Sequence, residues 1–397
     1  MSYRTLDNLD VAGKRVLLRA DLNVPMQDGR ISDTTRIDRL VPTILELSRA
    51  GARVVVMSHF GRPDGKASAK LSLAPLAAAL QSALGGKPVA FASDCIGAPA
   101  EAMIAQLANG DIGLLENLRF HAAEEANDTG FARALAALGD IYVNDAFSAA
   151  HRAHASTQAL AKLLPAAAGR LMQAELDALA HAMEQPKRPL IAIVGGAKVS
   201  TKLDLLGNLL AKVDILVIGG GMANTFLFAD GIGVGKSLCE RDMAATARGI
   251  AAKAKESGKR VMLPIDAVIA GKLENGVPVA TVPIAAVPAD QMILDIGPKS
   301  VAEITTAIAG CRTLIWNGPL GAFETSPFDA GTTAVARDVA RLVASGTLAA
   351  IAGGGDTVAA LAHAGVEDKL TYVSTAGGAF LEWIEGKELP GVAALGR

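Results

Sequence analysis

Cysteine is scarce in this chain. Only three cysteines occur among 397 residues, at Cys95, Cys239 and Cys311, and they lie far apart. Such spacing provides neither a disulfide framework nor the paired cysteines of a zinc site. We therefore expect a protein of a reducing compartment, with no metal cage built from cysteine.

The chain also lacks a marked excess of charge and any long apolar run. Its formal net charge is −2 at pH 7, whereas nucleic acids and anionic membranes select a strongly basic face. No uninterrupted apolar stretch approaches the ~20 residues that a membrane-spanning helix needs. The first residues lack the apolar centre of a signal peptide. These absences predict a soluble, cytoplasmic protein that binds small molecules rather than nucleic acid or membrane.

Apolar residues, in contrast, are abundant. Hydrophobic residues make up 51% of the sequence and charged residues 20%, which is enough to fill large buried cores. A chain of 397 residues exceeds the size at which a single core stops growing, so two domains of roughly 150–200 residues are expected.

Short β-branched runs alternate with longer helical patterns along the whole chain. Many runs are apolar throughout, as expected of parallel strands buried on both faces, and amphipathic helices such as 36–50 lie between them. The expected strands cover residues 15–19, 53–58, 89–92, 113–115, 141–144, 190–194, 215–218, 261–263, 313–316, 348–352 and 370–374. This alternation predicts an α/β protein with two Rossmann-like, three-layer α/β/α domains and mainly parallel sheets.

The pattern changes near the middle of the chain. Residues 171–184 form a helical stretch, which ends before Pro186 and Pro189, residues that resist helix continuation. We interpret this stretch as a hinge helix between a first domain, residues 1–170, and a second domain, residues 171–385, that includes the helix.

Several polar residues of the first domain follow expected strands, at the edge where open α/β sheets bind ligands. Asp21 and Asn23 lie two residues apart, so in extended backbone they point the same way. The alternative is ordinary turn chemistry before a proline. His59 and Arg62 share a loop shaped by glycine and proline, where a lone histidine is more often solvated than functional.

Arginines beside turn residues are the second feature of this domain. They are Arg36, Arg62, Arg119 and Arg152. Guanidinium groups bind anionic oxygens through paired hydrogen bonds, although each arginine taken singly could form a surface salt bridge worth at most ~1 kcal/mol. Their shared position after strands favours an anion site. His151 and His154 have a spacing that could hold a metal, but no third ligand lies nearby in the sequence, so a structural role is expected.

The second domain pairs apolar strands with glycine-rich turns. The strand at 190–194 runs into a Gly-Gly-Ala-Lys turn that ends at Lys198, and Lys202 follows. Because the two lysines are four apart, we expect them on one side of the first helical turn, where helix N–H groups suit a polyphosphate. The segment is not a Walker A loop, since Ser200 and Thr201 replace the required glycine and lysine.

Three later turns carry groups suited to a nucleotide. After the strand at 348–352, three glycines precede Asp356 and Thr357. Asp356 could cap the next helix or hold Mg²⁺, and Thr357 could donate to a phosphate. Glu324 could accept hydrogen bonds from sugar hydroxyls. A Gly-Gly turn at 377–378 opens the last helix with N–H donors that suit a phosphoryl group in transfer.

Taken together, these segments resemble the phosphoglycerate kinase family across almost the whole chain, from residues 15–25 to residues 380–382. The resemblance implies reversible transfer of the acyl phosphate of 1,3-bisphosphoglycerate to MgADP, giving 3-phosphoglycerate and MgATP in glycolysis. One departure is visible, because Ala376 stands where the family usually has a third glycine. We expect its N–H to remain available, since alanine tolerates helical angles well.

The resemblance also assigns roles to individual residues. It implies that phosphoglycerate is held by Asp21, Asn23, Arg36, His59, Arg62, Arg119 and Arg152. It implies that the nucleotide is bound by Gly196, Ala197, Lys202, Gly220, Asn317, Pro319, Glu324, Gly354, Gly355, Asp356 and Thr357, with Asp356 on the metal. The catalytic groups would be Arg36, Lys198, Lys202, Gly377 and Gly378.

The remaining implications concern assembly. Mg²⁺ would act as cofactor with ADP or ATP as co-substrate, and the protein would be a monomer. If the substrates sit on different domains, the domains must close around them, with rotation in the hinge segment. The tail, residues 386–397, would return to the first domain.

Two other functions fit parts of the pattern. A dehydrogenase needs a dinucleotide fingerprint, but Asn224 stands where the last glycine of that motif belongs. A non-catalytic nucleotide sensor could keep the glycine turns, yet it would have no use for the separate arginines or for paired Lys198 and Lys202.

Overall fold

The computed structural model describes residues 3–27 and 30–396. The chain divides into two compact units, which we call unit 1 and unit 2. Unit 1 runs to Leu176 and takes in the chain again from Glu388, and unit 2 covers Asp177–Lys387. Among the described residues, no helix combines the length and hydrophobicity needed to cross a bilayer.

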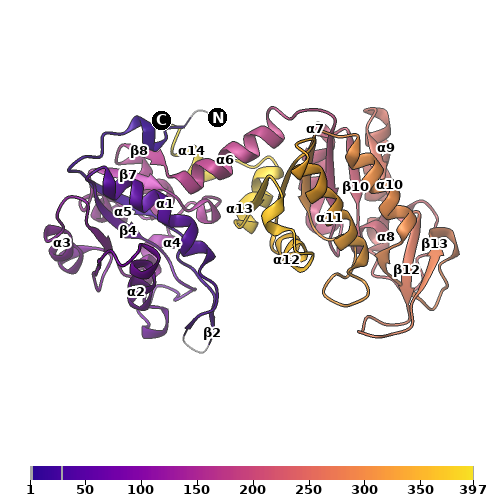
Figure 1. The fold of residues 1–397 in the computed structure, drawn as a ribbon, viewed down its shortest axis with the longest axis horizontal. Helices are drawn as coiled ribbons and strands as arrows, with labels where there is room; N and C mark the ends of the chain where they lie inside the picture. The colour runs from indigo at the N-terminus through magenta and orange to yellow at the C-terminus, as the bar shows by residue number, and fades with distance from the viewer. Residues whose placement is uncertain (1–2, 28–29, 397) are drawn as a thin grey trace. The chain divides into compact units, whose positions relative to one another are not determined.

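Unit 1 is built on a six-stranded parallel sheet in the order β5-β6-β4-β1-β7-β8, of which β4, β7 and β8 are labelled in Figure 1. Its strands are β1 (Arg15–Arg19), β4 (Arg53–Met57), β5 (Val89–Phe91), β6 (Ile112–Leu114), β7 (Ile141–Asn144) and β8 (Ala166–Ala168). Its helices are α1 (Thr35–Arg49), α2 (Ala74–Ala83), α3 (Gly97–Ala105), α4 (Ala122–Glu125), α5 (Thr129–Ala136) and α14 (Pro390–Ala393). A short antiparallel pair, β2 (Met26–Gln27) and β3 (Arg30–Ile31), extends from it. Because the sheet is parallel, its six strands end in loops at a common edge.

Unit 2 repeats the design with a second six-stranded parallel sheet, ordered β11-β10-β9-β15-β16-β17. Its strands are β9 (Leu190–Val194), β10 (Ile215–Ile218), β11 (Arg260–Met262), β15 (Thr313–Asn317), β16 (Ala349–Gly353) and β17 (Tyr372–Ser374). Its helices are α7 (Leu203–Lys212), α8 (Gly220–Ala229), α9 (Ala244–Glu256), α10 (Pro298–Ala309), α11 (Ala330–Ala344), α12 (Gly355–His363) and α13 (Gly377–Ile384). The predicted α/β class and mainly parallel sheets are therefore confirmed.

The strands predicted from the residue pattern are right to within about two residues at each end. The strands that were not predicted have weaker sequence patterns. Unit 2 contains a separate antiparallel sheet, β13-β12-β14, formed by β12 (Asp266–Ala270), β13 (Ala280–Pro283) and β14 (Met292–Ile296). This sheet was not predicted, because β13 is largely exposed and lacks the apolar run of a buried strand. Strand β8 was also missed, since its alanines favour helix in isolation.

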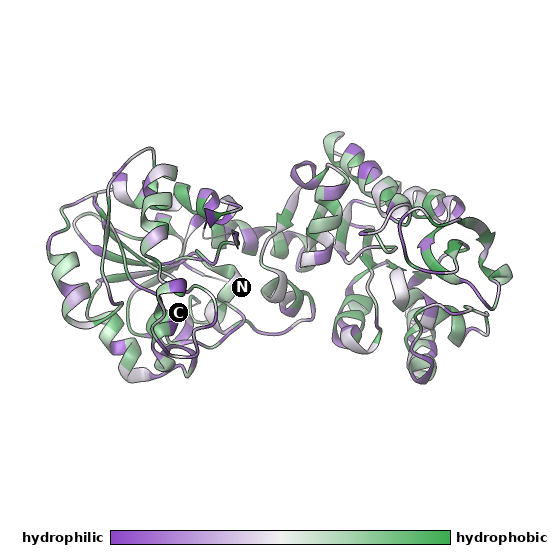
Figure 2. Cartoon of the chain, turned by 90° about the horizontal axis from the view of Figure 1, so that it is seen from below, coloured by the Kyte–Doolittle hydropathy of each residue, from purple (hydrophilic) through white to green (hydrophobic). Residues whose placement is uncertain are grey.

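Each parallel sheet is the centre of a hydrophobic core. In unit 1 the side chains of Val16, Leu18 and Val56 are fully buried, and β1 pairs in register with β4 and β7. In unit 2 all five residues of β9 are buried. Figure 2 shows hydrophobic colour concentrated along the strands and hydrophilic colour mostly on helices and loops. Burial of each large aliphatic side chain contributes roughly 1.5–3 kcal/mol, so the cores hold the strand-end loops in place.

The connecting helix is α6 (Arg170–Met183), which begins and ends within about one residue of the predicted hinge helix. The division between the units falls inside this helix, after Leu176, rather than at its start. Its first turn belongs to unit 1, where Asp145 accepts a hydrogen bond from Met172 N–H at 2.9 Å. Arg170 forms ion pairs with Asp7 and Glu46. These contacts fasten the start of α6 to unit 1.

The C-terminal segment packs on unit 1. Gly391 N–H donates to the Ala150 carbonyl at 2.8 Å, and the side chains of Leu389 and Leu395 are fully buried. In Figure 1, α14 accordingly lies with the first part of the chain. Unit 1 therefore includes residues from both ends of the sequence.

Candidate functional sites

In unit 1 the loop that follows β1 carries Asp21 and Asn23. The Asp21 carboxylate accepts hydrogen bonds from the Arg36 guanidinium and the Ser148 hydroxyl. Asn23 Oδ1 accepts from Gly61 N–H at 2.8 Å. The structure thus brings Asp21 and Arg36 into contact and ties Asn23 to the loop after β4.

Charge favours the ionised form of Asp21. Burial by itself raises its pKa, but the pKa lies below the usual value. His59 does not supply the required positive charge, because burial and the nearby Arg19 lower the pKa of His59 well below 6.5. The stabilising groups are therefore Arg36, the Ser148 hydroxyl and the N–H of Asn23. At neutral pH this site holds an ionised Asp21 beside an uncharged imidazole.

Arg19, which the sequence analysis did not single out, lies at the end of β1 and is fully buried. Its Nε donates to Ser156 Oγ at 2.9 Å, and its Nη2 lies 3.1 Å from His59 Nδ1. This arginine fixes the imidazole of His59 and places a positive charge beneath the loops. A charged residue inside an apolar strand pattern was the signal that could have identified it.

Arg119 is buried in the loop after β6. Its Nη1 donates to the Gly61 carbonyl at 2.8 Å, and its Nε lies 3.3 Å from Glu125 Oε1. Burial lowers its pKa, while Glu125 has the opposite effect. Asn23 and Arg119 therefore both hydrogen-bond to the backbone of Gly61. The loops after β1, β4 and β6 meet at this glycine.

The positive charges of this cluster act on one another. The pKa of His154 is lowered to about 4 by burial and then by the charges of Arg119, Arg19 and Arg152. Arg152 Nε donates to His151 Nε2 at 3.2 Å, so this ring nitrogen is engaged without a metal. A neutral histidine surrounded by arginines marks a region of positive potential, which attracts an anion.

Arg62 differs from the other predicted arginines because it is exposed. It lies three residues after His59, in the loop that Asn23 and Arg119 hold through Gly61. Most of the predicted residues of unit 1 therefore lie on the loops that follow its strands, whereas Arg36 lies in the first turn of α1, and Arg62 is at the solvent side.

In unit 2 Lys202 reaches back to the end of β9. Its ammonium donates to the Gly195 carbonyl at 2.7 Å and to Asn317 Oδ1 at 2.6 Å. Burial lowers its pKa to about 8, although the charges of Asp356 and Glu385 oppose the shift. Lys202 is thus a half-buried cation whose charge is only partly neutralised.

A pocket of about 370 Å³ opens beside this lysine. Six predicted nucleotide residues line it: Gly196, Ala197, Gly220, Pro319, Glu324 and Asp356. Glu324 and Asp356 are exposed, so two carboxylates face solvent at this pocket. The unpredicted strand β14 supplies part of the apolar wall, including Met292, Ile293 and Leu294.

Two helix N-termini meet next to the pocket. A Cβ added to Gly377, the first residue of α13, would lie 3.7 Å from the N atom of Gly355, the first residue of α12. Nothing lies within 4 Å of a Cβ added to Gly355, and Gly378 is exposed. Packing therefore does not require Gly355 to be glycine, and adjacent N–H groups are available for an anion.

The predicted arrangement of the two lysines is wrong. Helix α7 begins at Leu203 and is preceded by a 3₁₀ turn, Ser200–Lys202. Lys198 lies before both, in an exposed loop. The lysines therefore do not share the first turn of a helix, because the backbone after Gly196 stays irregular.

Two further groups have structural partners. Thr357 Oγ1 accepts from Gly318 N–H at 2.7 Å and donates to the Gly353 carbonyl at 2.8 Å. Asn317 Nδ2 also donates to Gly353, at 2.8 Å. The N-cap of α12 is Gly354, so Asp356 is not the helix cap and its carboxylate stays at the pocket.

Asp295 is a pocket residue that sequence reasoning missed. Its buried carboxylate accepts from Gly331 N–H at 2.7 Å, and burial raises its pKa to about 7. It supports the start of α11 behind the pocket wall. A single acidic residue within β14 was its only signal.

The pocket suits a magnesium–nucleotide complex. Mg²⁺ in such sites takes one or two carboxylates together with phosphate oxygens and water. Asp356 presents a carboxylate at the pocket. Its negative charge acts on Lys202 and opposes the lowering of the lysine pKa by burial. The residues present therefore fit the metal.

Comparisons with known proteins agree with this geometry. A family model described as phosphoglycerate kinase matches residues 6–387. The phosphoglycerate kinase of Methylorubrum extorquens (strain PA1) is 64% identical over 394 residues, covering 99% of this chain and 98% of its own. That of Rhodospirillum centenum (strain ATCC 51521 / SW) is 61% identical over 396 residues, covering 100% of both chains.

Solved structures give the same result. The phosphoglycerate kinase of Coxiella burnetii superposes with a TM-score of 0.92 at 43% identity, covering 99% of each chain. The enzyme of Pyrococcus horikoshii OT3 superposes with a TM-score of 0.79 at 30% identity, covering 99% of this chain and 98% of its own. The chain belongs to the phosphoglycerate kinase family and is an enzyme of that kind, a glycolytic transferase.

Proposed function

We propose that this enzyme transfers the acyl phosphate of 1,3-bisphosphoglycerate reversibly to MgADP, giving 3-phosphoglycerate and MgATP. The observation that carries the proposal is the cluster of arginines in unit 1, where burial and then the charges of Arg119, Arg19 and Arg152 lower the pKa of His154 to about 4. Such a cluster suits a small polyanion with a carboxylate and a phosphate.

Phosphoglycerate would bind on the strand-end loops of unit 1. Arg36, Arg62, Arg119 and Arg152 would bind its anionic oxygens, while Asp21 and Asn23 would bind its hydroxyl. The His59 imidazole, held by Arg19 at 3.1 Å, would serve as a neutral hydrogen-bonding group. Support comes from the links of Asn23 and Arg119 to Gly61, which orient these loops before a substrate arrives.

The nucleotide would occupy the 370 Å³ pocket of unit 2. Glu324 would accept hydrogen bonds from the ribose, and Lys202 would face the phosphates. Gly196, Ala197, Gly220 and Pro319 would line the base and sugar, with Asn317, Gly354, Gly355 and Thr357 shaping the phosphate end. Asp356 would hold Mg²⁺, which would supply neutralising charge to the phosphate oxygens when bound.

The chemistry needs alignment more than a reactive side chain. An acyl phosphate is already an activated donor, so neither a nucleophile nor a general base is required. Arg36, Lys198 and the N–H groups of Gly377 and Gly378 would stabilise the transferring phosphoryl group, whose charge is spread over three oxygens. Lys202 would neutralise the nucleotide phosphates.

Closure of the units would complete the reaction site. The predicted phosphoglycerate residues belong to unit 1 and the nucleotide residues to unit 2, so in-line transfer requires the two bound substrates to be brought into line. Rotation would occur within α6, beyond the turn that Asp145 fastens to unit 1. Closure would also exclude water, which would otherwise hydrolyse the acyl phosphate. We further propose that the enzyme acts as a cytoplasmic monomer.

A coupled assay of ATP formation tests this function. The purified enzyme should form ATP from 1,3-bisphosphoglycerate and MgADP, whereas a protein that only senses nucleotide would bind MgADP without turnover. Absence of turnover with both substrates bound would contradict the proposed reaction.

The loop residue Lys198 gives a sharper test. Lys198→Ala should lower kcat about 100-fold or more while changing KM little, because its proposed contact strengthens only in the transition state. Lys253→Ala, which removes an exposed lysine of α9, is the matched control and should change neither constant. A rise in KM alone would reduce Lys198 to a binding role.

A further inference from the structure

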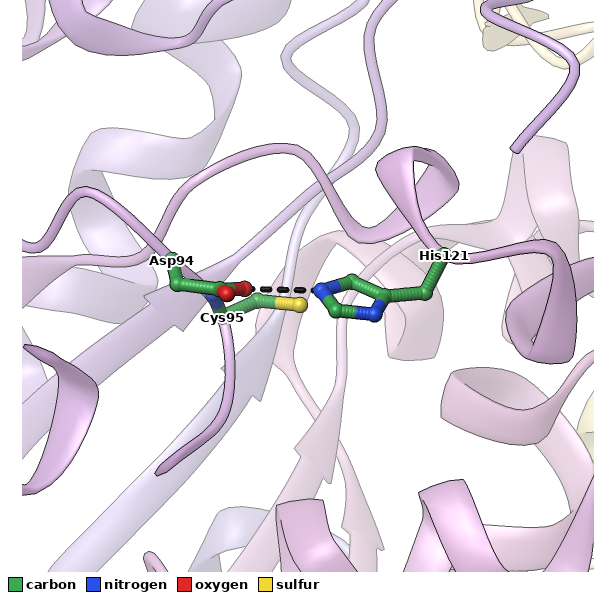
Figure 3. A group of neighbouring side chains, drawn as sticks. All are labelled: Asp94, Cys95 and His121. Carbon is green, nitrogen blue, oxygen red and sulfur yellow. Dashed lines mark hydrogen bonds and ion pairs between the residues drawn. The ribbon is translucent and has the colours of Figure 1, made fainter. Parts of the chain in front are cut away.

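A group of three potential metal ligands lies in unit 1, outside the proposed phosphoglycerate residues. Within the described part of the chain, Asp94, Cys95 and His121 place one ligand atom each within 4.8 Å of one another. Figure 3 shows the Asp94 carboxylate and the Cys95 sulfur pointing toward the His121 ring. The first two residues follow β5, and His121 precedes α4, so the group joins two loops that are distant in sequence.

We propose that Asp94, Cys95 and His121 form a binding site for a thiophilic divalent metal ion, with Zn²⁺ as the expected occupant. A sulfur, an imidazole nitrogen and a carboxylate oxygen are the ligands that Zn²⁺ prefers. A tetrahedral zinc, with bonds of about 2.0–2.3 Å, needs ligand atoms roughly 3.3–3.7 Å apart. In the structure the three ligand atoms lie within 4.8 Å of one another, and Asp94 Oδ1 lies 2.7 Å from His121 Nε2, so coordination would require the side chains to adjust.

The surroundings favour a cation. The Asp94 carboxylate lies 2.7 Å from His121 Nε2, the distance of a hydrogen bond that a metal would replace. Side-chain exposure is 40% for Asp94 and 31% for His121, whereas Cys95 is fully buried. The site thus opens to solvent on its oxygen and nitrogen side and has sulfur at its floor. The charges acting on the thiol are those of Asp94 and Glu124, both negative.

A nucleophilic role for the same residues is disfavoured. Burial and then the two carboxylates raise the pKa of the Cys95 thiol far above neutrality, so the free thiol is inert. In a Cys-His-Asp catalytic arrangement the carboxylate and the sulfur bond opposite ring nitrogens. Here Asp94 Oδ1 lies 2.7 Å from Nε2, and Figure 3 shows the Cys95 sulfur on the same side of the ring as that carboxylate.

Binding exchanges protons for metal in a balanced way. The Cys95 thiol gives one proton to solvent as its sulfur bonds the ion. His121 coordinates through a ring nitrogen that carries no proton, any proton on that nitrogen passing to solvent or to the other ring nitrogen, and Asp94 binds as the carboxylate. Water completes the fourth position. The ion would tie the loop after β5 to the segment that carries Arg119, two residues before His121.

Cobalt titration of the full chain tests the site, because Co²⁺ replaces Zn²⁺ and reports sulfur ligation through near-ultraviolet charge-transfer absorption. The wild type should develop this absorption, and added Zn²⁺ should abolish it. Cys95→Ser should remove it. His121→Gln and Asp94→Asn should each weaken binding at least tenfold, and both change partly exposed side chains, so folding should persist.

The other two cysteines provide the controls. Cys239→Ser and Cys311→Ser should retain the full absorption, since neither lies in a group of three ligands within the described residues. Absence of the absorption in the wild type would overturn the proposal. Its persistence in His121→Gln and Asp94→Asn, or its loss in Cys239→Ser, would overturn it equally by locating the metal elsewhere.

Discussion

The candidate anion sites of the two units are built from different groups. Unit 1 uses charged side chains, several of them buried, with Arg19 fully enclosed and Arg119 only 5% exposed. Unit 2 uses close backbone approach at glycines, with one half-buried lysine. Side-chain charge suits a small acid that must be gripped on several sides, whereas bare N–H groups suit a polyphosphate laid across helix N-termini. The same sheet architecture therefore carries two chemically different candidate sites.

The glycine scaffold of unit 2 should show the largest effect. A Cβ at Gly195 would lie 1.8 Å from the Pro319 carbonyl oxygen, so Gly195→Ala should destabilise unit 2 by about 3 kcal/mol or more. Both tryptophans, Trp316 and Trp383, belong to unit 2. Tryptophan fluorescence during denaturant unfolding therefore measures this unit selectively.

Gly355 provides the contrasting variant. Since nothing lies within 4 Å of an added Cβ, Gly355→Ala should leave the fluorescence midpoint nearly unchanged while weakening MgADP binding. Equal destabilisation by the two variants would show that both glycines serve packing, and the distinction between scaffold and contact glycines would fail.

The charge cluster of unit 1 should show the next largest effect. Arg119→Ala should weaken 3-phosphoglycerate binding by about 2–4 kcal/mol, or roughly 30- to 1000-fold, because it removes a buried cation. MgADP affinity should be unchanged. Arg133→Ala, which removes an exposed arginine of α5, should alter neither affinity. Calorimetric titration with each ligand measures both, and a parallel loss of MgADP binding would mean that the two sites are not independent.

Lowering the pH should change the stability contributions of His154 in unit 1 and Asp295 in unit 2 in opposite directions. The folded pKa of His154 is about 4, below the unfolded value of 6.5, so its contribution to stability is lost as pH falls from 6.5 to 4. The folded pKa of Asp295 is about 7, above the unfolded value of 3.8, so its contribution is lost as pH rises from 3.8 through 7.

Matched variants isolate these two contributions. Compared with His154→Gln, the wild type should lose up to about 3 kcal/mol of unfolding free energy between pH 6.5 and 4. Compared with Asp295→Asn, the wild type should gain unfolding free energy as the pH falls from 7 to 4. Asp145, whose pKa burial raises to about 6, opposes the histidine trend within unit 1, which is why variant differences are needed. The difference in unfolding free energy between wild type and variant should change with pH in opposite directions for His154→Gln and Asp295→Asn. The same change for both variants would refute the roles given to His154 and Asp295.

The sequence predicted the fold class well because apolar parallel strands and amphipathic helices have strong local periodicity. It failed for the antiparallel sheet, since β13 has little burial to generate a pattern. Loop geometry was less accessible. Lys198 was placed in a helix because spacing alone cannot reveal an irregular turn, and Arg19 was passed over because it stood inside a strand. Such residues depend on long-range contacts, as between Arg19 and Ser156.

The smallest predicted effect concerns the proton on Lys202. Its pKa is about 8 because burial outweighs the nearby carboxylates, so it is only partly protonated at pH 8. Nucleotide phosphates would raise that pKa, and MgADP binding should therefore take up as much as about half a proton at pH 8 and almost none at pH 6. Calorimetry in buffers of different ionisation enthalpy measures the uptake. Lys202→Gln should abolish it, whereas phosphoglycerate binding to unit 1 should leave Lys202 unaffected. Uptake that persists in Lys202→Gln would show that another group takes up the proton, and it would contradict the proposed contact between Lys202 and the nucleotide phosphates.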